Sequence, residues 1–376
     1  MILAIDIGTT FLKVAGIDFN GKINFFQKCA VDVKTGNGKY EVDPNNWSLA
    51  LVSLCSSIPV KLMKQVKAVV ISGNGPTIVP VDSTGEPVGN AYLWMDNRAN
   101  SVTDEIQSKL GEFLPPNFFL SKIYWLSRYK SDIYSKADSF LACPEYLSFV
   151  MTGEKYTLLP EEGFKGFYWN DEKISKLELD KCKFPGFISA KDQYGTYNGN
   201  LDIEGLDIGT PIICGGPDFL MSVLGSGSIS QGIICDRTGT SEGLNYCSSK
   251  PYNIDGLRTL PHLVPGLFTI SGLIPLSGEY VLSDQEDLLI KEYSNIINKM
   301  ISEGLPIKEI RIIGGHAGLT HLNELKAKSF PIPIKVYPEG SDLIGNGVLG
   351  SVVIGHYSTL EVACNNMIKE KICYNV

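Results

Sequence analysis

The chain has 376 residues, of which 44% are hydrophobic and 20% are charged, a composition typical of a globular protein with about two domains. The net charge is -8 and no cluster of Lys and Arg stands out, which argues against nucleic acid as a partner. The sequence has no apolar run long enough to cross a bilayer and no basic segment before its first apolar run, so it predicts a cytoplasmic protein without a membrane partner.

The first ten residues carry the most informative motif. An apolar strand expected over 2–5 runs into Asp6, and Gly8, Thr9 and Thr10 follow. Backbone N–H groups in such a turn can bind an anion, most often a phosphate. A carboxylate beside it is suited to a divalent cation that bridges phosphates. The alternative is an ordinary hairpin with a polar tip.

The first half of the chain alternates between predicted strands and helices. Strands are expected over 2–5, 11–18, 22–26, 66–72, 78–81 and 91–94, and helices over 47–58, 121–134 and 145–151. Asn20-Gly21 predicts a hairpin turn between the second and third strands.

The second half begins again with a strand and repeats the opening motif. A strand is expected over 211–214, a helix over 219–224, and further strands over 232–236 and 309–313. The strand that contains Asp236 leads into Gly239, Thr240 and Ser241, as the first strand leads into its turn. Two copies of one motif indicate two similar domains facing one ligand, which we place over 1–209 and 210–376.

Cysteine and histidine spacing gives no support for a metal site. The nine cysteines include no C-x-x-C pair, and several lie in apolar runs, such as Cys214 and Cys235. We interpret them as buried free thiols rather than disulfides or metal ligands. His316 and His321 are five residues apart, which is not the i, i+4 spacing of a helix face.

One glycine pattern imitates a dinucleotide motif. Residues 345–350 match G-x-G-x-x-G, but no strand is expected before them, so we interpret the glycines as sites of close helix packing. The sequence also lacks the G-x-x-x-x-G-K-[ST] of a P-loop.

The order of the motifs resembles that of the FGGY carbohydrate kinases, within the actin-like, sugar-kinase and Hsp70 ATPase superfamily. The matching segments are 6–10 (first phosphate loop), 93–99 (similar to the "LW.D.R" signature), 143–153 (similar to "DYL…LTG", with Glu145 for Asp), 209–218 (the segment of the catalytic aspartate), 238–241 (second phosphate loop) and 312–317 (adenosine segment). The resemblance implies an α/β fold of two ribonuclease H-like domains with a ligand cleft between them.

The resemblance also implies a function. The implied reaction is the ATP-dependent phosphorylation of a sugar or polyol hydroxyl, and a ketopentose such as xylulose is the leading candidate substrate. The implied cofactors are ATP and Mg²⁺. A homodimer is one oligomeric state that we consider. A catalytically weakened paralogue that binds sugar or nucleotide as a sensor is the alternative. A chaperone-like or activator ATPase of the superfamily is a third reading, against which the segment 94–98 argues.

The resemblance assigns roles to particular residues. Asp218 would take the proton of the attacking hydroxyl, and Asp6 would hold Mg²⁺. The nucleotide would contact Gly8, Thr9, Thr10, Lys13, Gly239, Thr240, Ser241, Gly314, Gly315 and His316. The substrate would contact Asn74, Gly75, Trp94, Asp96, Arg98, Asp218 and Phe219.

Structural alternatives accompany several of these roles. Asp218 precedes a helix and could be its N-cap. Trp94 could be a core residue beside an ion pair of Asp96 with Arg98, and Lys13 a solvated strand lysine. Gly314-Gly315 could be a plain strand-to-helix turn.

Three departures from the family pattern affect the expected substrate. Pro76 stands where the xylulokinase-like "GQMHG" has its histidine, and Phe219 stands where members often carry Asn or Gln. The chain is also short between Gly243 and Gly314. Since a site built to bind a hydroxyl loses selectivity without its polar partners, the changes at 76 and 219 predict a different or looser sugar preference.

Overall fold

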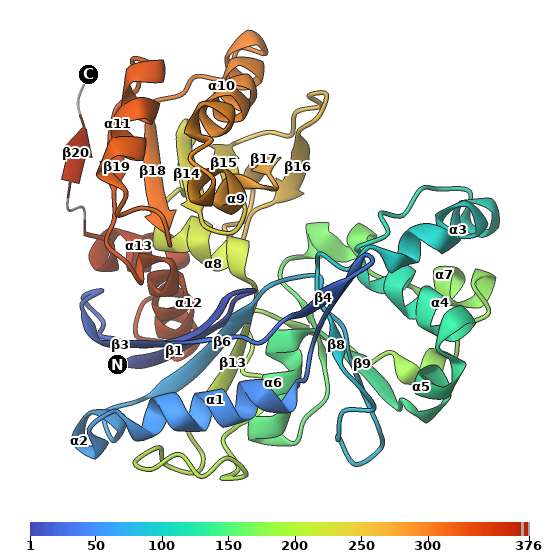
Figure 1. The fold of residues 1–376 in the computed structure, drawn as a ribbon. Helices are drawn as coiled ribbons and strands as arrows, with labels where there is room; N and C mark the ends of the chain where they lie inside the picture. Colours follow the sequence, from blue (N-terminus) through green and yellow to red (C-terminus); the bar gives the residue numbers. More distant parts are fainter. Residues whose placement is uncertain (370–371, 375–376) are drawn as a thin grey trace. The chain divides into compact units, whose positions relative to one another are not determined.

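The computed structural model describes residues 1–369 and 372–374. The chain divides into two compact units, one made of Met1–Gly16 and Phe25–Asp218, the other of Ile17–Asn24 and the chain from Phe219 onward. Each unit is built on one large sheet (Figure 1).

The elements up to residue 217 form the first unit, apart from the tip of one hairpin. Its strands are β1 (Ile2–Ile7), β2 (Phe11–Ile17), β3 (Ile23–Ala30), β4 (Lys34–Gly36), β5 (Lys39–Val42), β6 (Ala68–Gly73), β7 (Val79–Val81), β8 (Ala91–Tyr92), β9 (Ser139–Leu141), β10 (Thr157–Leu159), β11 (Phe187–Ser189), β12 (Gly195–Thr196) and β13 (Pro211–Pro217). Its helices are α1 (Asn45–Ser56), α2 (Val60–Met63), α3 (Thr103–Leu110), α4 (Phe119–Tyr129), α5 (Ser131–Lys136), α6 (Cys143–Thr152) and α7 (Asp171–Lys176), with 3₁₀ turns η1 (Arg98–Val102), η2 (Glu162–Phe167) and η3 (Lys181–Lys183).

The remaining elements form the second unit, except that Asp218, the first residue of α8, is counted with the first unit. They are α8 (Asp218–Gly225), β14 (Ile233–Thr238), β15 (Glu242–Ser248), β16 (Arg258–Pro261), β17 (Phe268–Ile274), α9 (Ser277–Leu282), α10 (Glu286–Ser302), β18 (Glu309–Gly314), α11 (Thr320–Ser329), β19 (Ile334–Val336), η4 (Ser341–Leu343), α12 (Ile344–Val353), α13 (Leu360–Met367) and β20 (Ile372–Tyr374).

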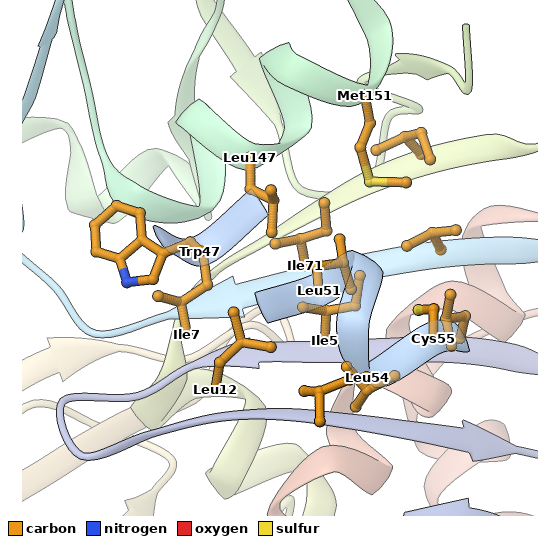
Figure 2. Close-up of a cluster of buried hydrophobic side chains, with 14 of the residues drawn as sticks. Ile5, Ile7, Leu12, Trp47, Leu51, Leu54, Cys55, Ile71, Leu147 and Met151 are labelled. Atoms are coloured by element: carbon orange, nitrogen blue, oxygen red, sulfur yellow. The ribbon is translucent and has the colours of Figure 1, made fainter. Parts of the chain in front are cut away.

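The sheet of the first unit has the order β12-β13-β6-β1-β2-β3, with β1, β6 and β13 parallel. α1 and α6 lie on one face of it (Figure 1). The apolar residues of α1 recur every three or four positions, so Trp47, Leu51 and Leu54 form one buried stripe. Figure 2 shows this stripe packed beside Ile5 of β1 and Leu147 of α6.

The sheet of the second unit has the order β16-β17-β15-β14-β18-β19-β20. β14 runs antiparallel to β15 and parallel to β18. Alternate residues of β14 face opposite sides: Ile234 packs in the core that includes Tyr293 and Ile297 of α10, and Cys235 packs with Val223 of α8. In both sheets, five neighbouring strands follow the same chain order, β3-β2-β1-β6-β13 in the first and β17-β15-β14-β18-β19 in the second. The repeated motif therefore does mark a repeated fold.

The division between the units differs from the expected boundary. β13 pairs in parallel with β6, so residues 211–217 complete the first sheet, and the division lies between Asp218 and Phe219 instead of at 209/210. When a long segment separates two paired strands, the local sequence of the second strand does not show which sheet it joins. The hairpin tip 17–24 is also counted with the second unit.

Other expectations held or changed in detail. The hairpin turn at Asn20-Gly21 is present, closed by the Asp18 N–H bonded to the Lys22 carbonyl at 3.0 Å. The helix expected over 121–134 is two helices, α4 and α5, that meet at Lys130. The 345–350 pattern lies in α12 as a packing feature: a Cβ on Gly345 would come within 1.8 Å of the Met221 carbonyl oxygen.

Candidate active site

Three parallel strands of the first sheet end in register at one edge. Ile7 of β1 pairs with Gly73 of β6, which pairs in turn with the last residue of β13. The next residues along each strand are Gly8, Asn74 and Asp218. Because neighbouring strands lie about 4.8 Å apart, this register brings the first predicted phosphate loop, a predicted substrate residue and the predicted catalytic aspartate together.

The first predicted phosphate loop is a tight turn with an acidic neighbour. The Gly8 N–H donates to the Phe11 carbonyl at 2.9 Å, which closes the turn. Asp6 is 7% exposed; its Oδ1 accepts from the Ser72 hydroxyl at 3.0 Å, and its Oδ2 lies 3.6 Å from Lys13 Nζ. Lys13 is therefore an ion-pair partner of Asp6 beside the turn.

Asn74 holds the turn that follows β6. Its Nδ2 donates to the Ile7 carbonyl at 2.9 Å, and its Oδ1 accepts from the Thr77 hydroxyl. Its backbone carbonyl lies 3.1 Å from the Cys143 thiol. At Gly75, by contrast, a Cβ would meet only the Pro217 side chain, at 3.8 Å. The Asn74 side chain thus braces the turn, while Gly75 leaves room beside it.

Trp94 connects two parts of the predicted site. Its indole Nε1 donates to the Thr9 hydroxyl at 3.0 Å. A residue assigned to the substrate therefore contacts a residue assigned to the nucleotide phosphates, although they are far apart in the sequence.

Arg98 binds two carboxylates, Asp96 and Glu41. Arg98 Nη2 lies 2.6 Å from Asp96 Oδ2 and 2.7 Å from Glu41 Oε1, and Asp96 is 2% exposed. The Arg98 guanidinium lies 4.7 Å from the centre of the Trp125 ring. Hydrogen bonds from Arg98 and Asn90 help to hold the pKa of Glu41 below its ordinary value, against the effect of burial. The structure thus shows the ion pair of Asp96 with Arg98, and the contact of these residues with a substrate hydroxyl stays a prediction.

Asp218 is the last residue of the first unit and the first residue of α8. Both Asp218 and Phe219 are half-buried. Phe219 is the first residue of the long segment that belongs to the second unit. The helix start is compatible with both readings of Asp218, as a cap and as a catalytic group.

The second predicted phosphate loop joins β14 to β15 and lies next to the Gly314-Gly315 segment. Thr238 pairs with Gly314 in the parallel ladder, and its backbone carbonyl accepts from the Gly315 N–H at 2.9 Å. Its hydroxyl accepts from the His316 N–H at 3.2 Å. Residues 239–241 and 314–316, both assigned to the nucleotide, are thereby fixed to one strand end.

Two residues that the sequence analysis missed support this second loop. The Ser277 hydroxyl donates to the Gly239 carbonyl at 3.2 Å, and the Gly278 N–H donates to the Thr240 carbonyl at 3.1 Å. Both residues begin α9, and nothing in their local pattern relates them to a loop so far back in the chain.

Asp236 is not the counterpart of Asp6, contrary to the reading of the repeated motif. The register places Ile7 and Thr238 at equivalent positions before their turns, so Arg237 corresponds to Asp6. A shift of one residue along a strand moves a side chain to the other face. Asp236 therefore points into the core of the second unit, where its Oδ2 accepts from Lys326 Nζ at 2.7 Å.

Lys326 and Glu242 complete a buried charge cluster beneath the second loop. Lys326 Nζ lies 2.9 Å from Glu242 Oε1, and the side chains of Asp236, Glu242 and Lys326 are all fully buried. Burial, and then the neighbouring Asp236, raise the pKa of Glu242 above its ordinary value. Burial and the Lys326 charge lower the pKa of His316, which keeps the imidazole neutral at neutral pH.

Within residues 1–369 and 372–374, no group of three or more His, Cys, Asp and Glu side chains is placed to hold a metal ion. No helix in the same part of the chain is long and apolar enough to cross a membrane.

Residues 1–225 match the sequence profile of the N-terminal domain of the FGGY family of carbohydrate kinases. The chain belongs to the FGGY family. It is 26% identical over 297 residues to a xylulose kinase of Lactococcus lactis subsp. lactis, a match that covers 74% of this chain and 59% of that protein. It is 24% identical over 268 residues to a gluconokinase of Bacillus subtilis, covering 66% of this chain and 52% of the relative.

Solved structures show the same fold. A ligand-bound xylulose kinase from Lactobacillus acidophilus superimposes with a TM-score of 0.84 at 18% identity, covering 100% of this chain and 93% of that one. A Plasmodium falciparum glycerol kinase with ADP gives a TM-score of 0.82 at 17% identity, with the same coverage. The matches to the L. lactis and Staphylococcus xylosus xylulose kinases span 59% and 64% of those relatives.

Proposed function

We propose that this FGGY family member transfers the γ-phosphoryl group of ATP to a hydroxyl of a sugar or polyol, with a ketopentose such as xylulose as the first candidate. The observation that carries the proposal is the register of β1, β6 and β13, which places Gly8, Asn74 and Asp218 at one sheet edge. Family membership and the xylulose kinases among the relatives support the choice of substrate class.

In this proposal Asp218 accepts the proton of the attacking hydroxyl. Phosphoryl transfer passes through a loose transition state, so the proton leaves the hydroxyl late and the positioning of that hydroxyl contributes most. The Gly8–Thr10 turn supplies N–H and hydroxyl donors to phosphate oxygens. The Gly239–Ser241 turn of the second unit is the other proposed phosphate loop. Trp94, held by Thr9, orients the acceptor beside the first turn.

Mg²⁺ would be held by phosphate oxygens and water together with Asp6. The protein ligands available here fit Mg²⁺, because this ion needs only one or two carboxylates when substrate phosphates supply other ligands. Asp6 is the carboxylate next to the first turn. When bound, the ion neutralises phosphate charge. Lys13, paired with Asp6 at 3.6 Å, adds a positive charge at the same place.

The decisive experiment measures ADP release with Mg·ATP against a panel of ketoses, aldoses and polyols. We expect turnover with at least one ketose or polyol in wild-type protein. Asp218→Asn should lose at least about 10³-fold in kcat, because general-base catalysis and positioning act together there. It should keep the wild-type affinity for a non-hydrolysable ATP analogue. Sugar and nucleotide binding without any turnover across the panel would instead favour a sensor.

A further inference from the structure

A buried lysine lies behind the predicted substrate residues. Lys122 is 3% exposed and lies in the part of α4, residues 120–126, in which every residue is buried. Its ammonium nitrogen donates to the Pro76 carbonyl at 2.7 Å and to the Leu93 carbonyl at 2.5 Å. Neither carbonyl belongs to α4, so the lysine joins two other segments of the chain.

These two segments carry the predicted substrate residues. Pro76 belongs to the turn after β6, immediately after Asn74 and Gly75, and Leu93 precedes Trp94. The segments also bond each other directly: the Ile78 N–H donates to the Tyr92 carbonyl at 2.9 Å, and the Tyr92 N–H donates back at 2.8 Å. Lys122 therefore fixes the ends of the two segments that lie nearest the site.

Packing alone does not account for a lysine at this position. Burial lowers the pKa of Lys122 to about 7, with Asp96 opposing the shift and Arg98 adding to it. A buried cationic group is tolerated only when hydrogen bonds replace its water, whereas an apolar side chain would pack there without that cost. The two carbonyl bonds are the compensation, and they are directed to the substrate segments rather than to the helix itself.

We propose that Lys122 is a positioning residue of the substrate site, whose ammonium sets the separation between the Asn74–Pro76 turn and Trp94. The inference rests on the proposed function and deepens it. Lys122 does not touch the substrate. It acts through the backbone of residues 76 and 93. Because Trp94 donates a hydrogen bond to Thr9, Lys122 also affects the position of the Thr9 hydroxyl in the first predicted phosphate loop.

The test compares Lys122→Met with a matched control, Leu126→Ala. Met keeps the length of the side chain and removes the donors; Leu126 is fully buried on the same helix and has no part in the carbonyl bonds. With a sugar that wild-type protein phosphorylates, we expect K122M to raise KM for the sugar at least about tenfold and to leave KM for ATP within about twofold. L126A should lower Tm and leave both constants within about twofold.

A merely structural role would give a different pattern. If K122M and L126A shift the two KM values alike, or if K122M leaves KM for the sugar unchanged, the proposal is overturned. Should K122M fail to fold, Lys122→Gln, which keeps one amide donor, is expected to raise KM for the sugar at least about threefold. A wild-type sugar KM in K122Q would equally reject the proposal.

Hydrogen exchange separates this inference from the proposed function. In K122M, but not in L126A, the amides of Ile78, Tyr92 and Asp96 should exchange faster, since their hydrogen bonds join or close the two segments. Faster exchange in a chain that phosphorylates nothing in the panel would reject the function and keep the positioning role. Unchanged exchange in K122M, together with an active wild-type enzyme, would reject the positioning role and keep the proposed function.

Discussion

At the scale of single residues, Gly314 carries two constraints that a larger residue does not meet. Its φ is +100°, and a Cβ there would lie 2.2 Å from the Thr238 carbonyl oxygen. Its neighbour Gly315 has open space where a Cβ would be. The fold therefore requires glycine at position 314, whereas at position 315 the space beside the backbone is open.

Gly314→Ala and Gly315→Ala test this separation. G314A should cost at least about 1–3 kcal/mol of unfolding free energy, because it adds backbone strain and a steric clash. G315A should stay within about 0.5 kcal/mol of wild type. It should nevertheless weaken ATP binding, because the proposed adenosine contact includes the backbone of Gly315. Urea denaturation and nucleotide titration measure the two effects. Equal stability losses in the two variants would contradict this account.

Glu145 shows how one buried carboxyl links structure to pH. Its Oε1 accepts from the Leu158 N–H at 2.8 Å and its Oε2 from the Ala142 N–H at 2.7 Å, at the start of α6. Burial raises its pKa to about 7, although these two hydrogen bonds lower it. The protonated form is therefore favoured in the folded state relative to the unfolded chain.

The sign of the pH effect follows from this shift. Because the pKa of Glu145 is higher in the folded state than in the unfolded chain, Glu145 contributes to the free energy of unfolding at low pH. This contribution is complete below about pH 4.5 and is lost as the pH rises to about 7. Relative to Glu145→Gln, which does not titrate, wild-type stability should fall by on the order of 3 kcal/mol across this window. Urea denaturation of both proteins from pH 4.5 to 7.5 measures the difference, and a difference that does not vary with pH would rule out this role.

At the scale of elements, β14, β15 and α11 are joined by the charge cluster of Asp236, Glu242 and Lys326. Two carboxylates and one ammonium lie in a region without solvent access, directly below the second predicted phosphate loop. Such a cluster is costly to break, because removal of one partner leaves unpaired buried charge.

Lys326→Met should therefore destabilise the protein by about 3–5 kcal/mol. The matched control is Lys335→Met on β19, since Lys335 pairs with Glu309 at 2.8 Å but is 21% exposed. It should cost no more than about 1 kcal/mol. Chemical denaturation compares them. If K326M is as stable as K335M, the cluster does not hold these elements together.

At the scale of the whole molecule, the two units are interleaved in sequence. The hairpin tip 17–24 belongs to the second unit, although the strands on either side of it continue into the first. Phe19 stacks on His356 with ring centres 3.9 Å apart, and its carbonyl accepts from the Tyr357 hydroxyl at 2.6 Å. A short segment near the start of the chain is thus part of the packing around α12 and α13.

Phe19→Ala should consequently loosen the far end of the sequence. We expect faster hydrogen exchange over 344–367 and a lower Tm, because the aromatic contact with residue 356 is lost. Phe113→Ala, at a side chain that is 60% exposed, serves as the control and should leave exchange in 344–367 unchanged. Faster exchange confined to the first unit in F19A would contradict the assignment of the hairpin tip.

The order of the motifs along the chain indicated the FGGY family by resemblance, and the profile of that family's N-terminal domain matches residues 1–225. Local pattern alone determined the alternating strands and helices, the two glycine–hydroxyl turns and the packing role of residues 345–350. These depend on residues close together in the sequence, where spacing and turn chemistry are sufficient. Only the tertiary structure decided that β13 joins the first sheet, that Arg237 rather than Asp236 matches Asp6, and that Lys122 bonds residues 76 and 93. Strand pairing and buried hydrogen bonds join residues that are distant in the chain, and no local periodicity records which of them will meet.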